Sequence, residues 1–215
     1  MHYTSVLFDL DGTLLDTLGD LTAAMNRTLT RHGLPERTRQ QMRAALGNGA
    51  RQLMELSVPA GTDGALFETL LAEYNADYAA HCRIETAPYP GVAALLRTLH
   101  TQGRKLAIVS NKPDEAVRAL RAEFFADTVP IAVGEKQGIR RKPAPDTLLT
   151  AMAQLGAERT STVYVGDSEV DIATARAAGL PCISVLWGFR DRDLLEQAGA
   201  QQFAADAGEL ARLLD

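Results

Sequence analysis

Residues 6–13 read Val6-Leu7-Phe8-Asp9-Leu10-Asp11-Gly12-Thr13, an apolar run that leads into two acidic residues and a glycine. The consecutive apolar residues favour a strand that is covered on both faces, as in a parallel sheet flanked by helices. While the chain stays extended, Asp9 and Asp11 project to the same side, and the glycine then allows a sharp turn. Two carboxylates this close repel each other unless a cation lies between them or one keeps a proton. A surface turn after a strand has the same letters, so the rest of the chain must decide.

The composition narrows the classes of protein to consider. The 215 residues carry a net charge of −5, from 22 basic and 27 acidic side chains, so there is no excess of positive charge for a nucleic acid partner. The only cysteines, Cys82 and Cys182, suggest neither a disulfide framework nor a zinc site. The N-terminus runs directly into the first strand without a secretion signal, and no apolar run is long enough to span a bilayer. We therefore expect a cytoplasmic protein without a membrane partner.

A long helical segment follows the first strand. Apolar residues within 18–32 recur at helical spacing, and similar patterns follow at about 38–46, 50–57 and 64–82. Nothing between residues 17 and 87 is typical of a strand. Because 215 residues can form one core with a large insertion, the sequence predicts an all-helical insert at 17–87 within a core formed by 1–16 and 88–215.

From residue 88 onward, helix and strand patterns alternate. The sequence predicts strands at 105–110, about 129–133, 162–166, 182–186 and 202–203, and helices at 91–102, 113–123, 145–155, 168–178, about 191–198 and about 206–214. Such alternation predicts an α/β fold in which right-handed crossovers build a doubly wound parallel sheet.

Polar residues lie where these strands end. In doubly wound sheets, ligands bind beyond the carboxyl ends of the strands, near the point where the strand order reverses. Three predicted strands end in polar residues: Asp9 with Asp11, Ser110-Asn111, and Gly166-Asp167. The loop Arg141-Lys142-Pro143, which precedes a predicted helix, places a cation nearby. We expect these side chains to meet in one crevice.

The same residues carry a resemblance to a known family. Asp-Leu-Asp-Gly-Thr at 9–13, Ser110-Asn111, Lys142-Pro143, and Gly166-Asp167 with Asp171 resemble the four ordered motifs of the haloacid dehalogenase superfamily of phosphotransferases. A helical insert directly after the first motif is similar to that superfamily's first type of cap domain. The resemblance implies a Rossmann-like catalytic core at 1–16 and 88–215 and a helical cap domain at 17–87.

The resemblance also implies roles for individual residues. Asp9 would attack the phosphorus of a phosphate monoester and form an aspartyl-phosphate, which divides one difficult displacement into two steps. Asp11 would protonate the leaving oxygen and later activate the hydrolytic water. Ser110 and Lys142 would hold and offset the charge of the transferring phosphoryl group. Thr13 and Asn111 are assigned to substrate binding.

Four acids around a dianionic phosphate require a cation. Mg²⁺ fits an oxygen-only site, with side-chain oxygens of Asp9 and Asp167 and the main-chain carbonyl of Asp11 as ligands. Asp171, one helical turn beyond Asp167, is expected to orient a metal-bound water. Other interpretations remain open: Ser110 could be an N-cap at the end of its strand, and Lys142 could be a solvated loop cation. Asp167 and Asp171 could be an N-cap or first-turn acid of a helix.

The cap is expected to choose the substrate, a small phosphorylated metabolite. Gly47-Asn48-Gly49-Ala50-Arg51 opens a helix whose N–H groups and arginine could face an anion, and it is similar to the cap of phosphoglycolate phosphatases. The resemblance implies 2-phosphoglycolate as substrate, although a plain turn with a surface Arg51 explains the same letters.

Several other activities remain open. A pyrophosphatase or another sugar-phosphate phosphatase would use the same core. So would a sugar-phosphate mutase, against which the absence of a histidine within Thr17–Asp20 counts weakly. A non-catalytic phosphometabolite-binding protein could keep the fold as well, since fold does not fix function. We expect a monomer or a homodimer.

Overall fold

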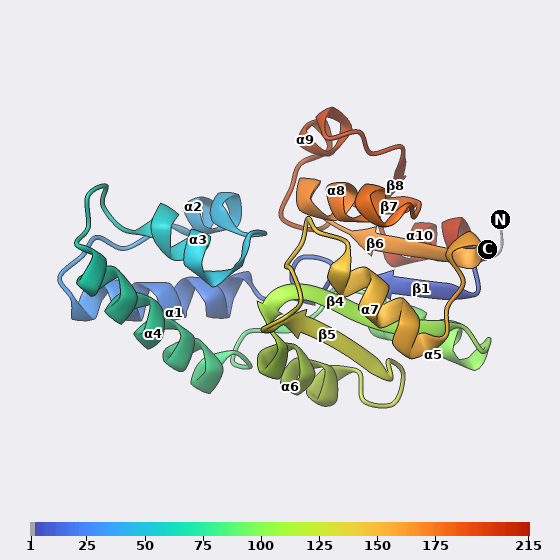
Figure 1. Ribbon diagram of the computed structural model, residues 1–215, viewed down its shortest axis with the longest axis horizontal. Helices are drawn as coiled ribbons and strands as arrows, with labels where there is room; N and C mark the ends of the chain where they lie inside the picture. The colour runs from blue at the N-terminus through green and yellow to red at the C-terminus, as the bar shows by residue number, and fades with distance from the viewer. Residues whose placement is uncertain (1–2) are drawn as a thin grey trace. The chain divides into compact units, whose positions relative to one another are not determined.

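The computed structural model describes residues 3–215, and the chain divides into two compact units (Figure 1). The first unit runs up to Asp16 and resumes over Pro88–Asp215, and the second is Thr17–Ala87. The chain passes between the units at β2 (Leu15–Asp16) and β3 (Ala87–Pro88), which pair with each other as a two-stranded sheet.

The first unit is built on a six-stranded sheet in the order β5-β4-β1-β6-β7-β8. The recorded pairings between these strands are parallel, which confirms the predicted α/β fold with a parallel sheet. The strand order reverses beside β1, because the chain adds β4 and β5 on one side of it and β6 to β8 on the other. The strands are β1 Ser5–Phe8, β4 Lys105–Pro113, β5 Ile131–Glu135, β6 Thr162–Gly166, β7 Cys182–Val185 and β8 Gln202–Ala204.

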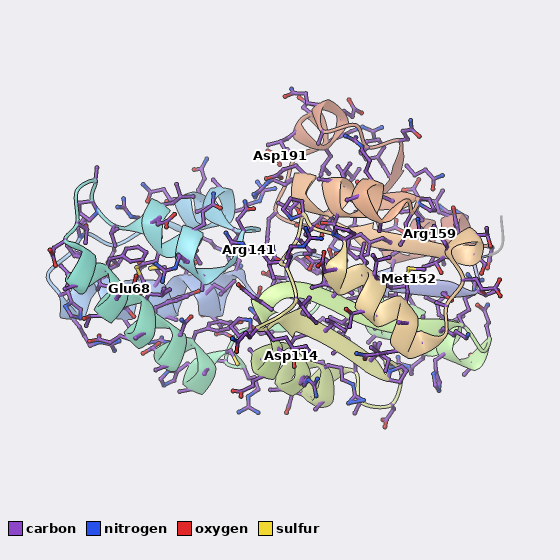
Figure 2. The ribbon with its side chains drawn as sticks, viewed as in Figure 1. Glu68, Asp114, Arg141, Met152, Arg159 and Asp191 are labelled. Carbon is purple, nitrogen blue, oxygen red and sulfur yellow. The ribbon has the colours of Figure 1, made fainter. Side chains whose placement is uncertain are left out.

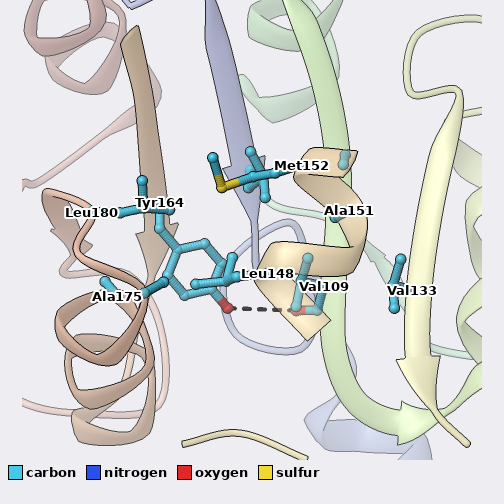
Figure 3. Close-up of a cluster of buried hydrophobic side chains, with 11 residues drawn as sticks. Val109, Val133, Leu148, Ala151, Met152, Tyr164, Ala175 and Leu180 are labelled. Atoms are coloured by element: carbon cyan, nitrogen blue, oxygen red, sulfur yellow. Dashed lines mark hydrogen bonds between the residues drawn. The ribbon is translucent and has the colours of Figure 1, made fainter. Parts of the chain in front are cut away.

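Both faces of the sheet are buried. On one face, Leu7 and Tyr164 belong to a hydrophobic cluster with side chains of two covering helices, α7 and α8 (Figure 3). Val6, Phe8 and Ile108 alternate with the residues of that cluster, so they project to the opposite face, and they are also fully buried. The helices of this unit are α5 Val92–Thr101, α6 Asp114–Phe124, α7 Asp146–Leu155, α8 Glu169–Ala178, α9 Arg192–Gln197 and α10 Ala207–Leu214, with a 3-10 turn η1 at Arg159–Ser161.

The second unit is helical, with α1 Leu18–Arg31, α2 Arg39–Ala45, α3 Gly49–Ser57 and α4 Gly64–His81. Thr38 and Gln41 form a capping box at the start of α2, and Asp63 caps α4 by accepting hydrogen bonds from two backbone N–H groups. Asp20, in the first turn of α1, accepts hydrogen bonds from residues 84–86 and so ties the last segment of the unit to its first helix.

None of the helices within residues 3–215 is both long enough and apolar enough to cross a membrane.

Candidate active site

Three buried carboxylates meet at one edge of the large sheet. Asp9 directly follows β1, Asp167 directly follows β6, and Asp171 lies in the first turn of α8. The register pairs Phe8 with Val165, so the carboxyl ends of β1 and β6 lie side by side. One carboxylate oxygen of each acid lies within 4.8 Å of the others, which is a spacing that could hold a metal ion.

Lys142 reaches this cluster from the loop between β5 and α7. Its Nζ donates hydrogen bonds to Asp9 Oδ1 at 2.8 Å and to Asp171 Oδ1 at 2.7 Å, and Lys142 is only 3% exposed. Asn111 fixes the backbone at Lys142, because its amide donates to the Lys142 carbonyl at 3.0 Å and accepts from the Lys142 N–H at 2.8 Å. The side chain of Asn111, predicted to bind substrate, therefore contacts the loop that carries the lysine. Arg141, the neighbour of Lys142, lies on the same loop (Figure 2).

Asp167 accepts a hydrogen bond at each of its two carboxylate oxygens. Thr13 Oγ1 donates to Asp167 Oδ1 at 3.1 Å, and the backbone N–H of Phe189 donates to Oδ2 at 2.7 Å. Glycines make room for it: a Cβ on Gly12, whose φ is +86°, would lie 2.3 Å from Asp167 Oδ2, and one on Gly188 would lie 2.3 Å from Asp167 Cβ. The side chain of Thr13, which is predicted to bind substrate, thus contacts Asp167 of the cluster and holds it in place.

Asp171 is engaged at both of its oxygens. Oδ2 accepts from the Ser168 hydroxyl at 2.6 Å and from the Ser168 N–H at 3.1 Å, while Ser168 Oγ accepts from the Asp171 N–H. This is a capping box, so the helix-start reading of Asp171 is correct alongside its contact with Lys142. The acid belongs both to the start of α8 and to the buried cluster.

Burial and neighbouring charges shift the protonation equilibria of these groups. Burial raises the pKa of Asp9 well above its usual range, although Lys142 acts against this. Burial and the charge of Asp171 raise the pKa of Asp167 to about 7. Burial opposes ionisation of Asp171 too, but the charge and hydrogen bond of Lys142, with hydrogen bonds from Ser168 and Tyr164, outweigh burial and lower the pKa of that carboxyl. Burial lowers the pKa of Lys142, but the charges and hydrogen bonds of Asp171 and Asp9 outweigh it, so this pKa is raised.

A second lysine, which the sequence analysis did not single out, lies beside Asp11. Lys112 Nζ is 2.9 Å from Asp11 Oδ1, and both side chains are largely buried. The strand β4 carries this lysine because it continues through Ser110 and Asn111 to Pro113, beyond its predicted end at residue 110. Ser110 Oγ accepts from the Lys112 N–H at 3.2 Å, and Ser110 is 2% exposed. The signal that could have identified Lys112 is its place directly after Ser110-Asn111.

Arg51, the cation predicted from the cap, lies at the surface of the helical unit. Its guanidinium makes two hydrogen bonds to Glu68 of α4, at 2.8 Å and 2.9 Å, and stands 5.4 Å from the centre of the Phe67 ring. Figure 2 marks the position of Glu68 on α4. The arginine side chain remains 50% exposed. Its role toward a substrate stays a prediction.

Fold and site together define a class of α/β protein. Its members carry buried carboxylates and a lysine at the carboxyl edge of a doubly wound sheet, with a helical unit inserted after the first strand. The family described as haloacid dehalogenase-like hydrolase matches residues 6–185, and the chain belongs to this family. The resemblance inferred from the motifs is therefore confirmed.

Named relatives extend this result. A phosphoglycolate phosphatase from Xanthomonas campestris pv. campestris is 37% identical over 187 residues, 86% of this chain and 84% of the relative. An N-acetylmuramic acid 6-phosphate phosphatase from Pseudomonas aeruginosa is 31% identical over 217 residues, which cover 100% of this chain and 96% of the relative. The crystal structure of a candidate phosphoglycolate phosphatase from Lactobacillus delbrueckii subsp. bulgaricus superposes with a TM-score of 0.94 at 36% identity, covering 100% of this chain and 99% of the other.

Proposed function

We propose that this protein is a Mg²⁺-dependent phosphatase that hydrolyses a small phosphate monoester, with 2-phosphoglycolate as the first candidate. The observation that carries the proposal is the convergence of Asp9, Asp167, Asp171 and Lys142 at one edge of the sheet. The family and the names of the relatives support the same reaction class.

In the proposed reaction, Asp9 is the nucleophile and the core unit is the catalytic domain. One oxygen of Asp9 attacks the phosphorus and forms the aspartyl-phosphate, while Lys142 stands 2.8 Å from Asp9 Oδ1, where it offsets negative charge. Asp11 protonates the leaving oxygen and then takes a proton from the attacking water. Lys112, 2.9 Å from Asp11, holds that side chain in place. Ser110 contributes its hydroxyl to the phosphoryl oxygens.

The chemistry of the acid cluster fits Mg²⁺. Its donors are oxygens only, as this hard cation prefers, and they are close enough to share one ion. Asp9, Asp167 and the main-chain carbonyl of Asp11 are the proposed ligands. Asp171 is proposed to act from outside this set, since hydrogen bonds to Ser168, Lys142 and Tyr164 already engage both of its oxygens. When bound, the ion would offset the negative charge of the acids and of the phosphate.

One assay tests the reaction class. Phosphate release from p-nitrophenyl phosphate is measured with Mg²⁺, with EDTA, and with the Asp9→Asn variant. We expect EDTA to abolish release and Asp9→Asn to lower kcat by at least about a thousandfold, because it removes the nucleophile. Asp127→Asn, which changes an exposed acid of the same unit, is the matched control and should keep full activity. Undiminished release by Asp9→Asn would end the proposed role of Asp9.

The helical unit is proposed to be the cap that selects the substrate. 2-Phosphoglycolate and N-acetylmuramic acid 6-phosphate, the substrates in the relatives' names, both carry a carboxylate besides the phosphate. Arg51 is the proposed partner of that carboxylate, in competition with Glu68. An ion pair as exposed as this one is weak, so a substrate anion could displace Glu68 at little cost.

A substrate panel tests the role of Arg51. We expect Arg51→Ala to lower kcat/KM about tenfold on carboxylated substrates and to leave p-nitrophenyl phosphate unchanged, as expected for the loss of one charge-assisted contact. Glu68→Gln should act in the opposite direction, because it frees the arginine. Arg83→Ala, which removes another exposed arginine of the helical unit, is the control. Unchanged kcat/KM of Arg51→Ala on every carboxylated substrate would refute the anion role.

A second candidate substrate is an acidic sugar phosphate. It is favoured by the match to the N-acetylmuramic acid 6-phosphate phosphatase, which extends over the whole of this chain. The panel decides between the two, since the better substrate has the higher kcat/KM. Transfer of phosphate to a sugar phosphate without net release would instead indicate a mutase, and binding without turnover would indicate a phosphometabolite-binding protein. The cytoplasmic location and the monomer or homodimer remain predictions.

A further inference from the structure

Tyr164 belongs to the hydrophobic core and to the acid cluster at once. It lies on β6 with its ring fully buried among core side chains that include Leu148 of α7 and Ala175 of α8 (Figure 3). Its hydroxyl, however, is 3.0 Å from Lys142 Nζ and 2.8 Å from Asp171 Oδ1. From the sequence, Tyr164 is predicted only to lie within the strand at 162–166.

The phenol completes the hydrogen bonding of the Lys142 ammonium. An ammonium has three N–H donors, and three acceptors lie within 3.0 Å of it: Asp9 Oδ1, Asp171 Oδ1 and the Tyr164 oxygen. The Tyr164 O–H has one hydrogen to donate. The carboxylate of Asp171 at 2.8 Å is a better acceptor for it than the carbonyl of Val109 at 3.5 Å.

Rigidity makes Tyr164 suited to this task. A lysine side chain is flexible along its four-carbon stem, and Lys142 comes from a loop rather than from a strand or helix. The tyrosine ring has only two side-chain torsions, and close packing against its neighbours fixes both. The position of the ammonium is therefore set by acceptors that are themselves fixed.

We propose that Tyr164 is a positioning residue that holds the Lys142 ammonium beside Asp9 through its hydroxyl. The inference rests on the proposed function, in which Lys142 offsets charge on the phosphoryl group. Without the hydroxyl, one N–H of the ammonium loses its acceptor, and the lysine can turn toward either acid. The charge that binds phosphate stays in the site, whereas its alignment in the transition state is lost.

The Tyr164→Phe variant of the full chain tests this inference. On p-nitrophenyl phosphate with Mg²⁺, we expect kcat to fall about tenfold while KM stays within about twofold, because only an interaction needed in the transition state is removed. Tyr3→Phe removes the hydroxyl of another buried tyrosine of the same unit and should leave both constants unchanged. A kcat for Tyr164→Phe within twofold of wild type, or an equal fall in Tyr3→Phe, would overturn the proposal.

A spectroscopic measurement follows the lysine itself. The chain has only four lysines, so protein labelled with ¹⁵N at lysine Nζ gives few ammonium signals, and that of Lys142 is identified by its absence in Lys142→Arg. In Tyr164→Phe, exchange of the Lys142 ammonium hydrogens with water should speed up at least about threefold, because one N–H lacks its acceptor. A fall in kcat with unchanged exchange would refute positioning through Lys142.

The wild type alone also tests the geometry if the variant fails to fold. Its Lys142 hydrogens must exchange much more slowly than those of Lys136, whose side chain is 36% exposed, and equal rates would overturn the proposal. Failure of the proposed function is recognised separately. In that case the wild type releases no phosphate, and the exchange measurements still decide whether Tyr164 holds the lysine.

Discussion

Replacement of Asp20 by asparagine should destabilise the helical unit strongly for so small a change. Asp20 is 3% exposed and accepts four hydrogen bonds from the segment at 84–86. Oδ2 accepts from Ile84 N, Thr86 N and Thr86 Oγ1, and Oδ1 accepts from Glu85 N at 2.9 Å. An asparagine has one acceptor oxygen. With that oxygen in the place of Oδ2, its NH₂ group faces the N–H of Glu85.

The size of the effect follows from these contacts. The substitution loses one hydrogen bond to a charged acceptor, about 2 kcal/mol, and weakens three others by removing the charge. We expect the free energy of unfolding to fall by about 3 kcal/mol. Asp63→Asn is the matched control: Asp63 also accepts from two backbone N–H groups, but it caps an exposed helix end, where asparagine serves as well as aspartate. We expect a change of less than about 0.5 kcal/mol there.

Two measurements check the Asp20 prediction. Urea unfolding followed by circular dichroism gives the change in free energy. Hydrogen exchange of the Ile84, Glu85 and Thr86 amides reports the contacts directly, and these amides should lose protection in Asp20→Asn but keep it in Asp63→Asn. A loss of less than about 1 kcal/mol with unchanged exchange would show that these four hydrogen bonds contribute little, which contradicts the reasoning.

Three further outcomes follow from the contacts described above. Gly188→Ala should raise the Mg²⁺ concentration needed for half-maximal activity at least about tenfold, because the added Cβ would displace Asp167. Gly64→Ala, whose added Cβ meets nothing within 4 Å, should leave that concentration unchanged. Asp77→Asn should cost about 1–2 kcal/mol at pH 7. Burial raises the pKa of Asp77, but the hydrogen bond and charge of Arg27, together with Arg31 and His81, outweigh it and lower this pKa below its ordinary 3.8. The contribution is therefore present above pH 3.8 and is lost as the pH falls through the lowered pKa, so the free energies of unfolding of wild type and Asp77→Asn in urea should converge as the solution is acidified. Mg²⁺ at about a hundred times its Kd should stabilise the wild type by about 2.7 kcal/mol in thermal unfolding, and Asp167→Asn much less.

Much of the fold could be predicted from the sequence because buried parallel strands and amphipathic helices have different periodicities. The strand predicted at 162–166 is β6, and the helical patterns within the insert are α1 to α4. The end of β4 was predicted too early. Polar residues 110–112 interrupt its apolar run, yet they stay buried because side chains at the edge of the sheet satisfy them. The two-residue strands β2 and β3 are too short to show a pattern.

The candidate site was predictable where it consists of charged residues at strand ends. Asp9, Asp167 and Lys142 were placed together by the rule for the carboxyl edge of a parallel sheet, and the structure brings them together. The supporting contacts could not be predicted in this way. Phe189 acts through its backbone N–H, which every residue except proline possesses, and Tyr164 has the letters of a core aromatic. Such contacts depend on how distant segments pack, which no local pattern records.

The charges of the core site explain why the proposed chemistry includes a divalent cation. The site holds four carboxylates against the two ammonium groups of Lys112 and Lys142, which leaves a net charge of −2 when all are ionised. A phosphate dianion would add two more negative charges. Burial, with help from the neighbouring acids, already raises the pKa of Asp9 well above its usual range, and a protonated Asp9 cannot attack phosphorus.

The ammonium of Lys142, only 2.8 Å away, opposes this rise, yet burial and the neighbouring acids still leave the pKa of Asp9 raised. A divalent cation shared by these acids would supply the remaining positive charge, and metal binding in general drives its ligands to lose their protons. In the phosphatase assay, the Asp9→Asn substitution therefore removes the nucleophile, whereas EDTA removes the cation. The substitution takes away the attacking oxygen itself, whereas EDTA leaves that oxygen in place and removes only the positive charge of the cation. Activity lost to EDTA should accordingly return in full when Mg²⁺ is added back, and activity lost to Asp9→Asn should not.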